Sequence, residues 1–206
     1  SIQNPWWRIN PPTTLWQGGE LKFDPVIEQY NRQALKWRPD VLGELNLKKI
    51  YFLAGLKGVG KTTLIKLLIK KLIEADKIKP NNLFFYSCHN LDSYEQLNEM
   101  IKLFLNWSGS ARERPLGKAQ DRRYIFIDEI AMVKQWRRGI DFLAKAGVLK
   151  NVTVILSGSS LDKAPGQAKI ERKLMSSLSF AEFMRLINPA LMKKIKSTNC
   201  RSWQAK

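Results

Sequence analysis

A glycine-rich segment constrains this chain more than any other feature of its sequence. Residues 55–62 read Gly-Leu-Lys-Gly-Val-Gly-Lys-Thr, which fits the pattern G-x-x-x-x-G-K-[ST]. The segment follows Ile50–Ala54, an apolar run typical of a strand buried on both faces, and it leads into residues 61–75, whose periodicity predicts a helix. A strand, a glycine loop and a helix in this order predict a phosphate-binding loop, because the helix N-terminus favours an anion at the same point.

Each fixed position of this loop has a chemical reason. Glycines let successive backbone N–H groups turn toward phosphate oxygens, Lys61 supplies positive charge to the β- and γ-phosphates, and Thr62 offers a hydroxyl to Mg²⁺. The alternative is a glycine turn that binds nothing. The predicted nucleotide-binding residues are Gly55, Leu56, Lys57, Gly58, Val59, Gly60, Lys61, Thr62 and Thr63.

An acidic pair ends a second apolar run. Residues 124–128 read Tyr-Ile-Phe-Ile-Asp, and Glu129 follows. We expect Asp128 to hold Mg²⁺ together with Thr62, and Glu129 to polarise a water for attack on the γ-phosphate. The alternatives are a strand-end turn for Asp128 and a first-turn acid of a helix for Glu129. Glu129 favours a hydrolase over a small-molecule kinase, because a kinase must exclude reactive water.

Apolar runs alternate with helical patterns along most of the chain. The expected strands are 50–54, 83–87, 124–128 and 152–157, and the expected helices are 25–37, 61–75, 93–107 and 133–146. This alternation predicts an α/β fold with a mainly parallel sheet covered on both faces. Together with the glycine loop it predicts a three-layer P-loop NTPase. The fourth strand leads into Ser157 and a Gly-Ser-Ser run, where a hydroxyl can contact the γ-phosphate or form an ordinary turn.

The charge balance points to a polyanionic partner. Among the 206 residues, 35 Lys and Arg face 18 Asp and Glu, a net charge of +17. We expect contact with DNA or RNA through the basic loop 108–123 and the basic C-terminal tail, and the alternative is a lysine-rich solvated surface.

Cysteine and histidine usage excludes other classes of protein. Two cysteines, Cys88 and Cys200, exclude a disulfide framework, and with His89 they leave little for a transition metal. Cys88 is expected to be a small buried residue. No 18-residue apolar segment or secretory signal is visible, so we expect a cytoplasmic protein without a membrane partner.

Several motifs in order resemble one family. They are Asn4-Pro-Trp-Trp, the loop with Lys61-Thr62-Thr63, Ile-Asp128-Glu129-Ile, Trp136, Leu-Ser157-Gly-Ser-Ser and Leu178-Ser-Phe-Ala-Glu-Phe. This set resembles the prokaryotic, largely archaeal, AAA-type ATPases whose ATPase domain usually precedes a C-terminal domain of unknown function. The likeness covers about residues 4–187, and its first and last motifs are the most specific.

The resemblance implies an AAA-like core with ATP and Mg²⁺ as cofactors. It places Ser157 at the first sensor position, which reads the γ-phosphate, and offers Arg172 as an arginine finger acting in cis or in a neighbouring subunit of a homo-oligomer. The family's glycine before this arginine is replaced by Glu171, and the alternative is a structural arginine. The expected organisation is a Trp- and Pro-rich arm over 1–22, an ATPase domain over 23–187 and a basic tail over 188–206. The arm is expected to be extended and to pack on the core, and the alternative is an arm that stacks on nucleobases or docks a partner.

Three functions remain open at this point. The leading one is an ATPase that couples Mg-ATP turnover to a conformational change, with Lys61, Asp128, Glu129, Ser157 and Arg172 as candidate catalytic residues. A second is a nucleic-acid-binding module switched by nucleotide with negligible turnover. A third is a P-loop small-molecule kinase. ATP is expected rather than GTP because no Asn-Lys-x-Asp-type guanine motif is present.

Overall fold

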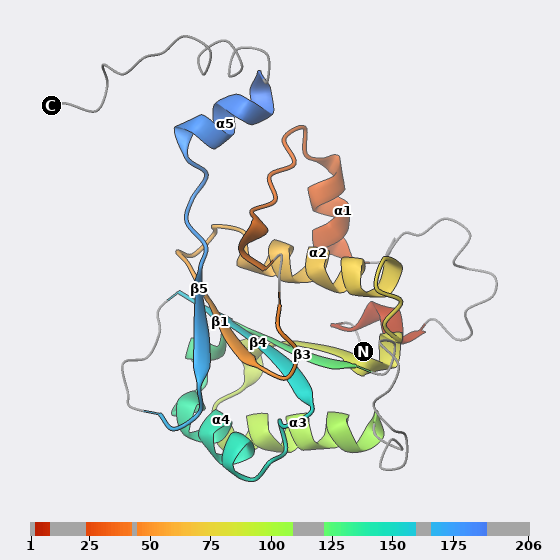
Figure 1. The fold of residues 1–206 in the computed structure, drawn as a ribbon, viewed down its shortest axis with the longest axis vertical. Helices are drawn as coiled ribbons and strands as arrows, with labels where there is room; N and C mark the ends of the chain where they lie inside the picture. The colour runs from red at the N-terminus through yellow and green to blue at the C-terminus, as the bar shows by residue number, and fades with distance from the viewer. Residues whose placement is uncertain (1–2, 9–23, 43–44, 109–121, 160–165, 189–206) are drawn as a thin grey trace, which may run out of the picture.

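A five-stranded parallel sheet organises the chain in the computed structural model, which describes residues 3–8, 24–42, 45–108, 122–159 and 166–188. The strand order is β2-β3-β4-β1-β5, and every neighbouring pair is parallel (Figure 1). All connections are therefore crossovers, and the carboxyl ends of all five strands lie at one edge of the sheet.

The strands are short and the helices that cover them are amphipathic. The strands are β1 (Ile50–Ala54), β2 (Leu83–Ser87), β3 (Arg123–Asp128), β4 (Val152–Gly158) and β5 (Ile170–Leu174). The helices are α1 (Pro25–Arg32), α2 (Lys61–Glu74), α3 (Tyr94–Trp107), α4 (Trp136–Lys145) and α5 (Phe180–Ile187).

Two hydrophobic clusters give the molecule three layers. On one face of the sheet α2 packs on Tyr51, Leu53 and Phe126, and α1 packs on α2. On the other face α3 and α4 cover Phe52 and Ile125. Figure 1 shows these layers, with α5 standing away from the sheet. The α/β, three-layer, parallel expectation is confirmed.

Several expected element boundaries were wrong. The first helix ends at Arg32 instead of residue 37, and residues 33–39 follow as non-helical chain. The expected helix over 133–146 begins only at Trp136, because Glu129 and Gln135 adopt left-handed backbone angles around the short 3-10 helix Ile130–Met132. The strand β5 and the helix α5 were not predicted. Strand β5 is an edge strand rich in charge, so it lacks the apolar run of a central strand.

The N-terminal residues seal the outer edge of β2 with side chains. The side-chain amide of Asn4 donates to the Phe85 carbonyl at 3.0 Å and accepts from the Phe85 N–H at 2.8 Å. Phe85 therefore makes the two backbone hydrogen bonds that a neighbouring strand would otherwise provide. The indole N–H groups of Trp6 and Trp7 both donate to the Leu83 carbonyl, at 3.0 and 2.9 Å. The edge is thus capped without an added strand.

These contacts explain the Asn-Pro-Trp-Trp motif as a packing device. Trp6 is fully buried, and Trp7 stacks at 5.9–6.1 Å between ring centroids on Phe84 and Phe104. Residues 5–8 form a 3-10 helix, not the extended arm that we expected, and the rest of the arm, 9–22, lies outside the described residues.

A buried ion pair ties α1 to α2 and to the N-terminal segment. The Lys66 ammonium lies 2.9 Å from the Asp24 carboxylate, with the two side chains only 6% and 3% exposed. The other Asp24 oxygen caps α1 by accepting from the N–H groups of Val26 and Ile27. Lys66 also donates to the Gln3 carbonyl at 3.2 Å. Burial lowers the Lys66 pKa, and the Asp24 charge opposes that shift.

Removal of the Asp24 charge is expected to destabilise the fold. In Asp24→Asn the helix cap remains possible, but Lys66 loses its partner, which costs about 3–5 kcal/mol and lowers the Tm by about 10 °C. The control Glu28→Gln removes an exposed pair with Arg32 on the same helix and should cost under about 1 kcal/mol. Equal melting temperatures for both variants in thermal unfolding would contradict this assignment.

Candidate functional site

The sheet order brings the sequence-predicted residues together. Strands β3, β4 and β1 are adjacent, so Asp128, Ser157 and the glycine loop all leave the sheet at the same edge. The loop begins where β1 ends, and its Gly55 N–H donates to the Gly158 carbonyl at 3.3 Å. Helix α2 then starts at Lys61 with its N-terminus at this edge.

Asp128 is the centre of a hydrogen-bond chain. Its carboxylate is buried, at 2% exposure of the residue, and the Thr62 hydroxyl donates to Oδ2 at 2.6 Å. The hydroxyl of Ser157, which is fully buried, donates to Oδ1. The same Ser157 oxygen accepts the Glu129 N–H at 3.3 Å. Four predicted residues from α2, β3, β4 and the turn after β3 therefore form one connected group.

Glu129 and Lys61 differ in how they are presented. Glu129 has a left-handed φ of 55°, and it is partly exposed while Asp128 is buried. The Lys61 ammonium is 2.9 Å from the Gly55 carbonyl and 3.0 Å from the Leu56 carbonyl, and the residue is 4% exposed. Lys61 thus folds back over its own loop, among the groups expected to meet a phosphate.

Met175 packs against the loop from the end of β5. Its N–H donates to the Ala54 carbonyl at 2.7 Å, and its methyl carbon lies 3.4 Å from where a Cβ on Gly60 would be. A Cβ on Gly55 would meet the Met175 carbonyl oxygen at 2.6 Å. Gly58 and Gly60 have φ of 81° and 100°, which other residues rarely adopt. The glycines therefore serve both loop curvature and a close contact.

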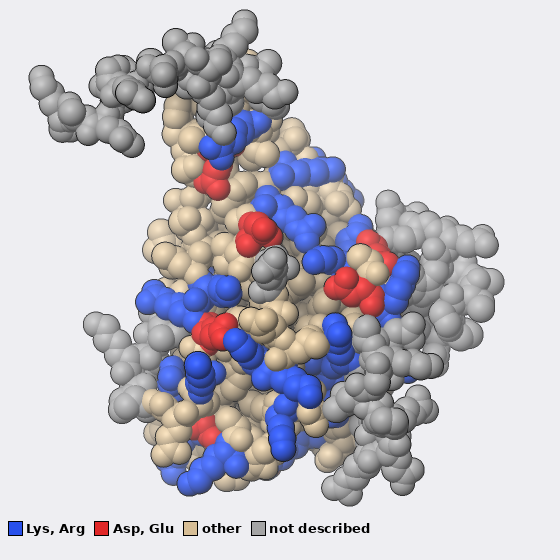
Figure 2. All heavy atoms as spheres, viewed as in Figure 1, with Lys and Arg blue, Asp and Glu red and all other residues tan. Residues whose placement is uncertain are grey.

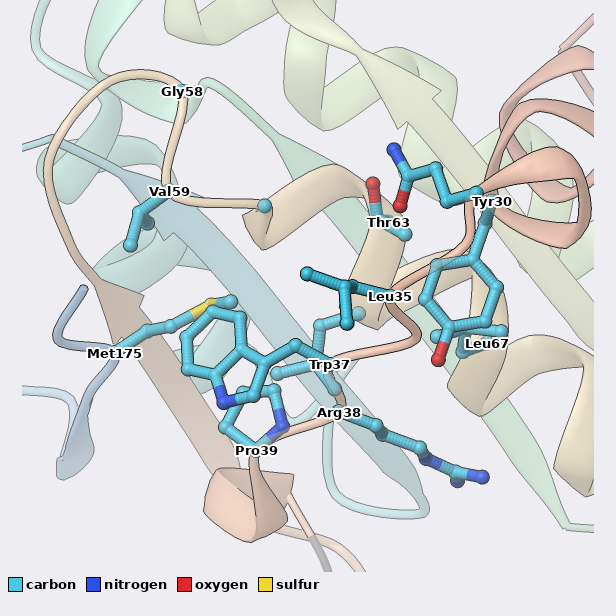
Figure 3. Close-up of a pocket in the computed structure, with 13 residues that line it drawn as sticks. Tyr30, Leu35, Trp37, Arg38, Pro39, Gly58, Val59, Thr63, Leu67 and Met175 are labelled. Carbon is cyan, nitrogen blue, oxygen red and sulfur yellow. The ribbon is translucent and has the colours of Figure 1, made fainter. Parts of the chain in front are cut away.

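A pocket of about 240 Å³ opens beside the loop (Figure 3). Its walls come from the segment that follows α1, from the loop, from α2 and from Met175. In Figure 3 the Trp37 ring lies beside Met175, Leu35 points into the pocket, and the Arg38 side chain points away from the loop. The lining residues are Tyr30, Gln33, Leu35, Trp37, Arg38, Pro39, Gly58, Val59, Gly60, Thr63, Leu64, Leu67 and Met175.

Sequence reasoning missed the wall that precedes β1. Residues 30–39 were expected to be mostly helical, and the chain there carries no motif that marks a binding wall. Trp37 before the apolar run of β1 was the available signal. Met175 carried none, because β5 itself was not predicted.

Arg172 is not joined to this group. It is exposed on β5 and pairs in register with Phe52, whose ring packs under α4 at 5.7 Å from Trp136. Its side chain therefore belongs to the sheet face opposite α2. Within the described residues, no ion pair links it to the glycine loop or to Asp128.

The remaining singled-out residues are structural in character. Cys88 is buried, as expected. Burial is the main cause that raises the pKa of its thiol to about 12, and the negative charges of Asp128 and Glu129 add to it, so the thiol stays protonated. Trp136 is 2% exposed in the core. Across the described ranges there is no group of three His, Cys, Asp or Glu side chains fit to hold a metal, and no helix with the length and apolarity of a membrane span.

The fold and this group of side chains define a P-loop nucleotide-binding domain. A family model described as an AAA domain matches residues 47–184, about two thirds of the chain, and the chain belongs to that family. An uncharacterized protein of Methanocaldococcus jannaschii, MJ1637, is 24% identical over 172 residues, covering 78% of this chain and 34% of that protein. The chain thus spans about a third of the length of this relative.

Solved structures are also matched, at low identity. A DNA polymerase III gamma subunit-related protein from Thermotoga maritima matches 84% of this chain and 53% of its own, with 10% identity and a TM-score of 0.47. The Aeropyrum pernix ORC1 protein, solved in complex with DNA, matches 84% of this chain and 48% of its own, with 15% identity and a TM-score of 0.43.

Gly55→Ala is expected to damage both the fold and nucleotide binding. The new Cβ overlaps the Met175 carbonyl, a backbone atom that cannot rotate away, at a cost of about 1–3 kcal/mol. The control Gly147→Ala meets nothing within 4 Å and pays only for its φ of 72°, about 1 kcal/mol. Thermal unfolding and ATP titration check both. Unchanged binding in Gly55→Ala would show that the contact has no role.

Proposed function

We propose that the protein binds Mg-ATP at the glycine loop and hydrolyses it, coupling turnover to a conformational change. The observation that carries this proposal is the chain of hydrogen bonds from Thr62 through Asp128 and Ser157 to Glu129. It joins the proposed magnesium-binding residues, Thr62 and Asp128, to the backbone N–H of Glu129, whose carboxylate is proposed to activate water.

Thr62 and Asp128 fit a magnesium ion by the chemistry of their donors. Both present oxygen atoms at hydrogen-bond distance, and Mg²⁺ prefers oxygen ligands from one or two carboxylates besides the phosphates. The ion, when bound, neutralises phosphate charge. The hydrogen bond from Ser157 fixes the orientation of the Asp128 carboxylate before a metal ion binds. Lys61 supplies a second positive charge, after exchanging its two loop carbonyls for phosphate oxygens.

Glu129 is assigned as the residue that orients and deprotonates the attacking water. The partial exposure of Glu129 gives water access that the buried Asp128 lacks. Its N–H bond to Ser157 fixes the backbone from which the carboxylate projects. Ser157 thus contacts both acidic residues, which suits the sensor role that its position suggests. The proton leaves the water for Glu129 as the oxygen attacks phosphorus and the bond to the leaving phosphate oxygen breaks.

The pocket beside the loop is proposed to take the nucleobase of ATP. Its apolar and aromatic wall adjoins Gly58–Gly60 and Thr63, as a base must when its phosphates lie on the loop. The Trp37 ring is available for stacking on the base. Arg172, exposed on the edge strand, is proposed to act on a neighbouring copy of the chain, as an arginine finger in a homo-oligomer.

A nucleic-acid-binding module with negligible turnover is the second candidate, favoured by the net charge of +17. The expected contacts in 108–123 and in the tail fall almost entirely outside the described residues, since the structure describes only Ser108, Arg122 and Arg123 of that loop. A small-molecule kinase is disfavoured because Glu129 is proposed to activate water, and a kinase must exclude reactive water from its site.

Glu129→Gln is expected to abolish phosphate release while ATP binding persists. Loss of the general base should lower the rate by about 10²–10⁴-fold. Lys61→Ala should weaken ATP binding itself. The matched control Glu99→Gln changes an exposed carboxylate on α3 and should leave turnover unchanged. Phosphate release from Mg-ATP and ATP titration measure these effects. ATP binding without phosphate release in the unaltered chain, with or without nucleic acid, would favour the binding module instead.

Trp37→Ala is expected to weaken ATP binding by about 5–100-fold, which corresponds to about 1–3 kcal/mol of base stacking. Tripolyphosphate, which has no base, should bind this variant as it binds the unaltered chain. Trp107→Ala serves as the control, because Trp107 is a 55% exposed ring at the far end of α3. If ATP and tripolyphosphate weaken together, the pocket does not hold the base.

A further inference from the structure

Basic residues mark the amino ends of the strands, opposite to the nucleotide site. Lys48 and Lys49 precede β1, Lys150 precedes β4, Arg122 precedes β3, and Lys169 precedes β5. Because the strands are parallel and adjacent, these side chains gather along one edge of the sheet. We call them the amino-end basic edge. All five residues are exposed.

The turn that presents Lys48 is held by buried hydroxyl groups. The Lys48 N–H donates to the hydroxyl of Thr153, which is 2% exposed on β4, at 3.0 Å. The Tyr51 hydroxyl accepts the Asn46 N–H at 2.8 Å and donates to the Asn46 carbonyl at 3.3 Å. Lys48 keeps a left-handed φ of 60°, where glycine or asparagine is usual. A lysine therefore occupies a position where its backbone conformation is unfavourable.

Acidic side chains neutralise this edge only in part. Glu171 pairs with Lys49 at 2.5 Å, and the charges of Lys173 and Lys169 also lower the pKa of Glu171. One carboxylate thus meets three ammonium groups. Figure 2 shows Lys and Arg gathered in the lower half of this face, over the region where β1 and β4 begin, with few acidic atoms among them. Within the described residues, Lys48 and Lys150 have no ion pair.

We propose that the amino-end basic edge binds the phosphate backbone of a double-stranded nucleic acid, at the end of the sheet opposite to the nucleotide. From β5 to β3 the edge crosses three strand spacings, about 14 Å. A duplex carries one charge per about 1.7 Å of axis, so a segment of that length offers about eight phosphates. A row of cations on rigid strand ends suits such a regular array.

The neighbouring side chains favour a duplex over the other polyanions. Single strands are bound largely by stacking on exposed aromatic rings, and the tyrosines beside this edge, Tyr51 and Tyr124, are buried. Stable adsorption to a membrane needs apolar insertion besides charge, and Leu47, 38% exposed, is a small apolar area for that purpose.

The test compares two triple variants of equal net charge. Lys48→Gln, Arg122→Gln and Lys150→Gln neutralise the basic edge, and Arg32→Gln, Lys134→Gln and Arg185→Gln neutralise exposed cations elsewhere. Fluorescence anisotropy with labelled 20-base-pair DNA and RNA duplexes and their single strands, without nucleotide, gives Kd over a salt series. Sedimentation with anionic lipid vesicles measures membrane binding. Because no ATP is present, the result stands apart from the ATPase proposal. ATP titration and thermal unfolding confirm that both variants are folded.

The edge variant is expected to weaken duplex binding by at least 10-fold and to lower the salt slope by about 2–3, since each lost phosphate contact removes about one unit. The control variant should change Kd by less than about threefold. Binding of either duplex in this pattern supports the proposal. Equal weakening by both variants, stronger binding of the single strand, or binding only to anionic lipid vesicles overturns it.

Discussion

The buried carboxylate of Asp128 is the interaction on which the rest of the site depends. It receives one hydroxyl from α2 and another from β4, so the orientation of three elements converges on two oxygen atoms. A carboxyl group at 2% exposure is costly to bury unless such donors surround it. The two hydroxyl donors reach Asp128 because β3, β4 and β1 are neighbours in the parallel sheet, with their carboxyl ends at the same edge. The geometry of this group of side chains therefore depends directly on the strand order.

The fold resolves its two sheet edges differently. Beside β2, side chains of Gln3 and Asn4 substitute for a missing strand, and the buried pair between Lys66 and Asp24 holds the same segment against α2. Beside β5, charged residues occupy the edge strand. The first solution stabilises by satisfying backbone groups, whereas the second discourages further pairing through charge.

Much of the site could be predicted because its residues sit in short, local motifs. The glycine loop and the pair Asp128 and Glu129 follow apolar runs, and parallel strands place such strand ends together whatever the rest of the chain does. Ser157 was found for the same reason. The expected strands and helices were therefore mostly confirmed, and parallel order followed from their alternation.

What sequence reasoning missed depends on contacts between distant segments. In the sequence Lys66 looks like a surface lysine on an apolar helix. Its burial is possible because Asp24, which precedes a different helix, forms an ion pair with it that offsets the loss of hydration. The segment with Trp37 has a helical pattern but becomes a pocket wall by packing beside the loop. Strand β5 carries charges on its exposed edge, so its sequence lacks the signature of a buried strand. These are tertiary effects, and local patterns do not contain them.

The contact between Met175 and Gly55 links the glycine loop to the segment that leads into α5. The Met175 carbonyl lies where any side chain on Gly55 would have to be, and its N–H is bound to the last residue of β1. Five residues later the chain enters α5, which stands off the body with Phe180 79% exposed. Because Met175 is bonded to the residue just before the loop and also leads into α5, the start of the loop and the connection to α5 share one backbone anchor.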